Sequence, residues 1–118
     1  MKQIEKETTL EVKILQWLSL KDPEIAGQIK ASTVTKREYS GAGFFFELSV
    51  SKDADPVDKQ IKTLDGPQIK SSRLEFGGGS ILFLEDGYRK ILELFSYGDS
   101  FPEDMSEFEL HEGTIKKM

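Results

Sequence analysis

An N-terminal helix is the first element that the pattern of apolar and polar residues predicts. Apolar side chains recur every three or four positions across residues 10–18, which is the period of one helical face. Residues 8–11 match a capping box, in which Thr8 and Glu11 satisfy free amide groups at a helix start. The pair Asp22-Pro23 breaks the pattern and can open one further short turn. We therefore expect a helix from about Thr8 to Lys21.

Two strands are predicted next along the chain. Residues 29–39 are rich in Thr, Val and Ser and alternate loosely, which favours a partly exposed strand. Residues 44–51 alternate strictly between apolar and other side chains, which is typical of a half-buried antiparallel strand. The charged residues 52–64 contain a proline and predict a loop, with a short helix around residues 57–61 as the alternative.

Three shorter strands are predicted after the turn Asp65-Gly66-Pro67, at residues 69–76, 80–85 and 88–97. The triple glycine of residues 77–79 separates the first two as a tight turn or bulge. The pair Asp86-Gly87 separates the last two and is a strong hairpin signal, because both residues tolerate the positive φ angles of a two-residue turn. Residues 80–85 and 88–97 should therefore be antiparallel neighbours.

The fold class that follows is α+β, in a single domain of residues 1–118. We expect the N-terminal helix to pack on an antiparallel, meander-like sheet of about five strands. Both faces of the hairpin at residues 80–97 carry apolar side chains, so both need cover. The helix can cover one face. A second layer or a second copy in a homodimer would have to cover the other.

The composition narrows the chemistry available to the chain. Its 118 residues include one histidine and no cysteine, which excludes disulfides, thiolate nucleophiles and metal sites built on sulfur or on several imidazoles. No cofactor is expected. The start of the chain lacks the apolar run of a secretory signal, and no apolar run is long enough to cross a membrane, so we expect a cytoplasmic protein.

The net charge of -5 is concentrated near the C-terminus. Residues 1–80 hold 12 basic and 12 acidic side chains, whereas residues 81–118 hold 4 and 9. Acidic side chains interleave with aromatic ones across residues 97–112, which suits a surface that binds a basic protein. The expected binding residues are Tyr97, Asp99, Phe101, Glu103, Asp104 and Glu107. A solvated face with no partner is the alternative.

Other site chemistries fit the sequence less well. The triple glycine precedes a strand, whereas phosphate loops precede a helix, and the segment after Asp53 fails the pattern of a calcium loop. Basic side chains are scattered, so no nucleic-acid surface is expected. His111 fits an ordinary surface residue. Glu47 and Glu93, on strands, are the remaining candidates for acid and base catalysis.

Several short motifs resemble those of a group of small uncharacterised bacterial α+β proteins, over about residues 40–102. They are the glycine-rich entry to a strand at residues 41–46, the hairpin with its Asp-Gly turn at residues 81–88, and the exit Tyr-Gly-Asp-x-x-Pro at residues 97–102. The group implies no established activity. In size and charge the chain is similar to immunity proteins of toxin systems.

Two functions are therefore expected as alternatives. The first is a non-enzymatic cytoplasmic interaction protein, of the immunity-inhibitor type, that presents the acidic residues 99–112 to a basic partner. The second is a small-molecule-binding domain or enzyme whose pocket lies between helix and sheet and uses Glu47, Glu93 or Tyr97.

Overall fold

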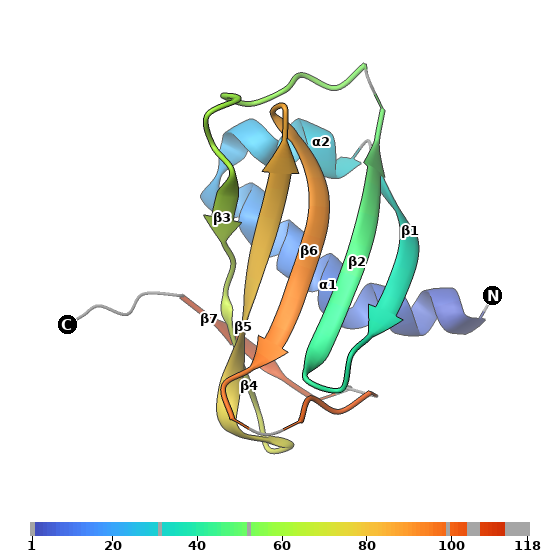
Figure 1. Cartoon of the computed structure of the whole chain (residues 1–118), viewed down its shortest axis with the longest axis vertical. Helices are drawn as coiled ribbons and strands as arrows, with labels where there is room; N and C mark the ends of the chain where they lie inside the picture. Colours follow the sequence, from blue (N-terminus) through green and yellow to red (C-terminus); the bar gives the residue numbers. More distant parts are fainter. Residues whose placement is uncertain (1, 31, 52, 99, 104–106, 113–118) are drawn as a thin grey trace.

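One long helix lies behind an antiparallel sheet in the computed structural model (Figure 1). The structure describes residues 2–30, 32–51, 53–98, 100–103 and 107–112. The helix, α1, spans Lys2–Lys21, and the described residues form seven strands in one sheet. The α+β class is thereby confirmed. No helix in the described ranges is long and apolar enough to cross a membrane.

The strands do not follow one another across the sheet as a simple meander. The elements after α1 are η1 (Pro23–Ile25), α2 (Ala26–Lys30), β1 (Ser32–Tyr39), β2 (Gly43–Val50), β3 (Thr63–Asp65), β4 (Gln68–Ser71), β5 (Leu74–Glu85), β6 (Tyr88–Ser96) and β7 (Glu109–His111). The order across the sheet is β1-β2-β6-β5-β4-β7, and β3 also pairs with β5. The estimate of about five strands was too low, because β3 and β7 have three residues each and leave no periodic signal.

The two ends of α1 differ in how well they were predicted. Its C-terminal end at Lys21 is confirmed, and the turn η1 follows Asp22 as expected. The start near Thr8 is wrong, because α1 already begins at Lys2 and the capping-box segment lies inside it. The short helix α2 also occupies the first residues that were assigned to a strand, so β1 begins only at Ser32.

The triple glycine does not divide two strands. β5 runs continuously through residues 77–79, while Gly77 has a φ of 78° and the pairing of β4 with β5 shifts register nearby. The bulge was thus expected, but the separation into two strands was wrong. The reason is that glycine admits close neighbours without ending the strand: a Cβ at Gly79 would lie 2.7 Å from Oη of Tyr97 and 2.9 Å from ring atoms of Phe95.

The hairpin between β5 and β6 forms as predicted. Asp86 and Gly87 both have positive φ angles, 55° and 86°, as a type I′ turn requires. Residues 53–62 contain no helix, so the predicted loop is correct over these residues and its helical alternative is wrong, but the loop ends earlier than predicted because β3 begins at Thr63.

The hydrophobic core lies between α1 and the sheet. α1 contributes one apolar stripe, and the strands contribute the alternate residues that face it. The fully or nearly buried apolar residues are Leu10, Ile14, Leu15, Leu18, Ile25, Phe44, Phe46, Leu48, Ile69, Leu74, Leu82, Leu84, Leu92, Leu94 and Phe101. One face of the sheet is therefore covered, as expected.

Strand β1 ends the sheet on one side. Its pairing with β2 is interrupted by a bulge between Val34 and Lys36, so that Thr35 has no direct partner in the ladder. Most of its side chains are exposed. The guanidinium of Arg37 folds over the ring of Phe44, 4.3 Å from the ring centre.

Candidate functional site

The face of the sheet that points away from α1 is open. Among the residues that the structure describes, no helix or strand packs over the middle of this face (Figure 1). Alternation along the strands places on it side chains that are half-buried or exposed. We call this surface the open face; its central residues are Phe45, Glu47, Ile81, Phe83, Ile91, Glu93 and Phe95.

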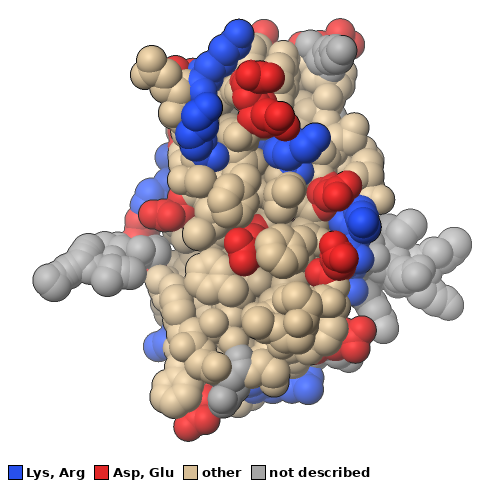
Figure 2. Space-filling model, viewed as in Figure 1, with Lys and Arg blue, Asp and Glu red and all other residues tan. Residues whose placement is uncertain are grey.

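A regular row of side chains crosses the open face. The pairing register places Glu38, Phe45, Glu93, Ile81 and Asp65 side by side on β1, β2, β6, β5 and β3. We call these five residues the acidic row, in which carboxylates alternate with apolar side chains. Neighbouring strands lie about 4.8 Å apart, so the carboxylates recur roughly every 10 Å. Figure 2 shows the same face as mainly uncharged, with separate acidic groups set among the uncharged side chains.

The carboxylates of the acidic row are not neutralised by the chain itself. Within the described ranges no ion pair joins Glu38, Glu93 or Asp65 to a cation. Arg37, the neighbour of Glu38 on β1, stacks instead on Phe44 and Phe46. The charges of the row are therefore available to another molecule.

Of the aromatic anchors predicted from the sequence, one is exposed and one is not. Tyr97 is 51% exposed and packs edge-on against Phe95, with ring centres 5.7 Å apart, at the end of the open face. Phe101 is fully buried, so it cannot contact a partner as expected. Its ring packs at right angles to Phe44 in the core, with ring centres 5.8 Å apart, while its N–H donates to Gly41 and its carbonyl accepts from the Tyr39 hydroxyl.

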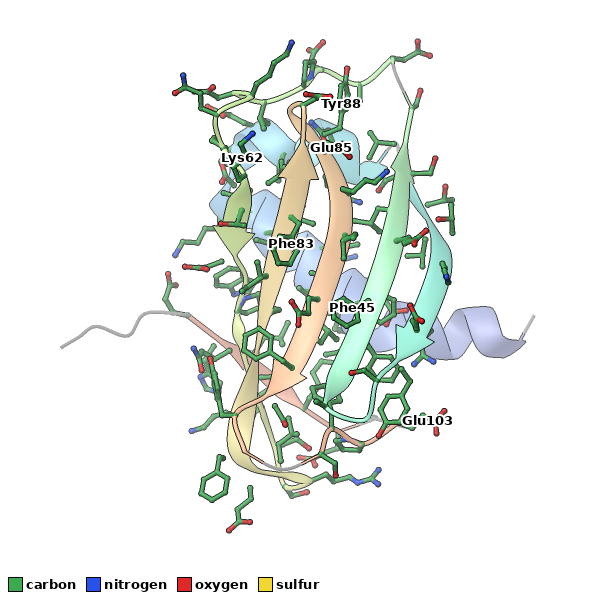
Figure 3. The ribbon with its side chains drawn as sticks, viewed as in Figure 1. Phe45, Lys62, Phe83, Glu85, Tyr88 and Glu103 are labelled. Carbon is green, nitrogen blue, oxygen red and sulfur yellow. The ribbon has the colours of Figure 1, made fainter. Side chains whose placement is uncertain are left out.

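The predicted acidic residues after the hairpin have separate surroundings. Glu103 is exposed and lies below Phe45 in the view of Figure 3. Glu107 accepts a hydrogen bond of 2.9 Å from the Ser72 hydroxyl. Asp99 and Asp104 lie outside the described residues.

Farther along, the chain binds its own acidic side chains. Glu109 contacts His111 at 3.1 Å, and Glu112 forms an ion pair with Lys21 at the end of α1. The strand β7 itself pairs with β4 at the edge of the sheet. Residues 107–112 are therefore held against the protein's own surface, and the acidic row is the better binding candidate.

Glu47 and Glu93 do not line a pocket between helix and sheet. Their neighbours Phe46, Leu92 and Leu94 fill that space, so both carboxylates point to the open face. This position overturns the pocket that the sequence suggested for an enzyme. Among the described residues no group of three or more acidic or histidine side chains could hold a metal ion.

A cleft opens where β2 and β6 separate. Their last paired residues are Glu47 and Ile91, and beyond them the strands diverge around a volume of about 660 Å³. Residues of β1, β2, β6 and the Asp86 turn line the cleft, and Figure 3 shows Glu85 and Tyr88 at this end of the sheet. Lys90 lies 3.8 Å from Glu85.

The cleft has a buried arginine in its wall. Arg89 is 1% exposed, because a bulge after Phe83 turns it toward the side of the sheet that carries Leu84. Its Nη2 donates to the Ser32 hydroxyl, whereas Nε and Nη1 have no hydrogen-bond partner within the part of the chain that the structure describes. Burial lowers the pKa of Arg89 from its ordinary value to about 10. The charged guanidinium is thus less stable here than in water.

Gln28 of α2 fixes the backbone beside this arginine. Its side chain is fully buried; Nε2 donates to the carbonyls of Gly87 and Asp55, at 2.7 and 3.0 Å. Its Oε1 accepts the backbone N–H of Arg89 at 2.9 Å. One amide side chain therefore joins α2, the loop before β3 and the β5–β6 hairpin.

Known proteins give no guide to either surface. Comparisons with family models, curated proteins and solved structures find no match. The resemblance to small bacterial proteins accordingly stays a prediction. The open face and the cleft are therefore the two surfaces of the molecule from which a function can be inferred.

Sequence reasoning missed both the acidic row and Arg89. Members of the row are far apart in the chain and meet only through strand pairing, so no local motif marks them. Arg89 and Lys90 look like an isolated basic pair on a surface strand. Only the bulge in the pairing of β5 with β6 separates the buried residue from the exposed one.

Proposed function

We propose that the chain is a non-enzymatic binding protein that holds a basic protein partner on its open face. The observation that carries this proposal is the acidic row, in which unpaired carboxylates alternate with apolar side chains on an uncovered sheet surface. Such a surface can combine two effects: charge steers the encounter and aligns the partner, and burial of apolar side chains supplies affinity. Phe45, Phe83 and Phe95 are the aromatic groups available for burial.

The spacing of the row limits the form of the partner. Carboxylates about 10 Å apart match cations on every seventh residue of a helix, which lie on nearly the same face about 10.5 Å apart. Between those cations the partner needs apolar side chains to meet Phe45 and Ile81. The proposed partner therefore presents alternating basic and apolar groups.

The charge of the row argues against a second copy of the chain as the partner. A twofold axis places one surface against itself, so carboxylates of the two copies would face each other near Glu93. The closest basic residue in the register is Lys36, at the edge beside Glu47. We expect light scattering over a wide dilution range to give the mass of a monomer. A concentration-dependent dimer that Glu93→Lys disrupts or strengthens would instead support the homodimer.

An immunity-type inhibitor of a basic toxin, acting in the cytoplasm, is one form of this function. It suits a chain of 118 residues with a net charge of -5. In that role the protein would cover a cationic surface of the toxin by charge and shape, without chemistry of its own.

Charge reversal tests the proposed function. Proteins captured by the wild-type chain from a lysate of its source organism would be identified, purified and titrated by calorimetry. The double variant Glu38→Lys/Glu93→Lys is expected to bind the basic partner about tenfold more weakly or worse, because it replaces attraction by repulsion within the interface. Wild-type affinity should also fall as salt is raised.

The matched control changes the same net charge elsewhere. Glu24→Lys/Asp53→Lys alters two exposed carboxylates outside the acidic row, on η1 and in the turn after β2. This control should keep nearly the wild-type affinity. Equal affinity of the partner for the row variant and the wild type, or equal losses in both double variants, would contradict docking on the open face.

A further inference from the structure

Arg89 lacks the partner that a buried guanidinium normally has. Nη2 of Arg89 donates a hydrogen bond to the Ser32 hydroxyl, whereas Nε and Nη1 have no acceptor within the described residues. Buried polar groups without a hydrogen bond are rare, and a buried charge without a counterion is rarer. An incoming acceptor would therefore gain strong, charge-assisted hydrogen bonds at this position.

The cleft between β2 and β6 offers a route to this arginine. Arg89 lines it, and its volume of about 660 Å³ lies within the range of small-molecule sites. Protein atoms cover Nε and Nη1 in the unliganded form. The guanidinium must therefore turn from Ser32 toward the cleft to bind a ligand.

The other charged side chains of the cleft determine which charged groups a ligand needs. Lys90 is engaged with Glu85, but Glu47 and Asp86, which also line the cleft, have no ion pair in the described ranges. A simple anion such as phosphate would be attracted by Arg89 and repelled by both carboxylates. A molecule with a carboxylate at one end and an ammonium at the other satisfies both kinds of group.

We propose that the cleft between β2 and β6 binds a small amino-carboxylic acid, with its carboxylate on Arg89 and its ammonium group near Glu47. The ligand replaces the missing acceptor of the guanidinium and supplies a counterion to Glu47. This site is separate from the acidic row, although Glu47 lies between the two. The amino-carboxylic acid in the cleft and the protein partner on the open face therefore contact different residues.

Nuclear magnetic resonance can observe the proposed contact directly. The probes are glycine, 4-aminobutyrate and 6-aminohexanoate, which scan the separation of the two charged groups. At millimolar concentrations at least one should move the Nε–H resonance of Arg89 to saturation, while hexanoate, which lacks the ammonium group, binds more weakly. If no amino acid of the series moves this resonance, the proposal is overturned.

Variants separate a binding role of Arg89 from a structural one. In Arg89→Met the backbone amides of the cleft residues Leu48 and Tyr88 serve as the probes; the amino acids should shift them in the wild type and no longer shift them in the variant. The variant without amino acid should be at least as stable as the wild type, because the substitution removes an unsatisfied buried charge. Arg73→Met, in the exposed turn between β4 and β5, is the matched control and should change neither. Unchanged binding in Arg89→Met would contradict the proposal.

A second variant keeps the test decisive if Arg89→Met does not fold. Glu47→Gln should weaken the best amino acid about tenfold, because the ammonium contact is lost, while hexanoate should bind no more weakly than before, because one repelling carboxylate is removed. Equal effects on both probes would overturn the assigned orientation. The variant Glu38→Lys/Glu93→Lys should retain the amino-acid response, so failure of the cleft and failure of the open face give different results.

Discussion

Replacing Gly43 with alanine is expected to destabilise the protein by at least about 4 kcal/mol, the range of exceptional single substitutions. A Cβ at this position would lie 1.8 Å from the carbonyl oxygen of Leu94 and 2.9 Å from Cα of Phe95. These are backbone atoms of the central strand β6, which cannot move aside as a side chain could. Urea denaturation, or failure to obtain folded protein, would measure the effect.

Gly27→Ala is the matched control for that substitution. Gly27 lies in α2, is exposed, and has no atom within 4 Å of the position of a new Cβ. Alanine there should raise the free energy of unfolding by about 0.5–1 kcal/mol, because it restricts the unfolded chain and favours the helix. A Gly43→Ala protein as stable as the wild type would show that β2 and β6 are not packed this closely.

Gln28→Ala is expected to have the second largest effect, a loss of about 2–4 kcal/mol in the free energy of unfolding. The Arg89 amide loses its acceptor and the Asp55 carbonyl loses its donor, whereas Gly87 keeps a hydrogen bond from Val57. The Arg89 amide is buried, so without an acceptor it loses its hydration with nothing in return, whereas water can reach the partly buried Asp55 carbonyl. Calorimetric or urea unfolding gives the stability.

Amide hydrogen exchange locates the damage caused by Gln28→Ala. The Arg89 amide should exchange faster in the variant, since the structure shows the Gln28 side chain as its acceptor. Gln16→Ala, on an exposed position of α1, should change stability by no more than about 0.5 kcal/mol. A loss below about 1 kcal/mol for Gln28→Ala would mean that water replaces the amide.

The elements that were predicted correctly are those that local chemistry determines. The Asp86-Gly87 turn needs positive φ angles at two adjacent residues, and Asp22-Pro23 stops a helix wherever it occurs. The strict alternation of residues 44–51 likewise fits only a strand with one buried face. In each case a few neighbouring residues are enough to determine the local structure.

The elements that were missed depend on distant parts of the chain. β5 continues through its glycines because Phe95 and Tyr97 on the neighbouring segment occupy the space that side chains would need. Phe101 is buried in the core, where its ring packs against Phe44 and its backbone binds Gly41 and Tyr39. Such contacts can be predicted only when the strand order is known, and no local signal in the sequence places β6 between β2 and β5.

The candidate site changed for the same reason. The charge excess of the last third of the chain was visible in the sequence, but several of those carboxylates are bound by Lys21, Ser72 and His111. The carboxylates of the acidic row come from β1, β3 and β6, with apolar residues of β2 and β5 between them, and only Glu93 belongs to the last third of the chain. The distribution of net charge along the sequence therefore did not predict the acidic row, whose carboxylates have no ion pair among the described residues.

The bulge at Thr35 bears on how copies of the protein meet at high concentration. An edge strand is a template on which further strands can add, and that addition is the first step of fibril growth. On β1 the ladder is broken at Thr35 and followed at once by Lys36 and Arg37, a combination that opposes such growth. The protein can thus leave the open face of its sheet uncovered while this edge resists amyloid-like aggregation.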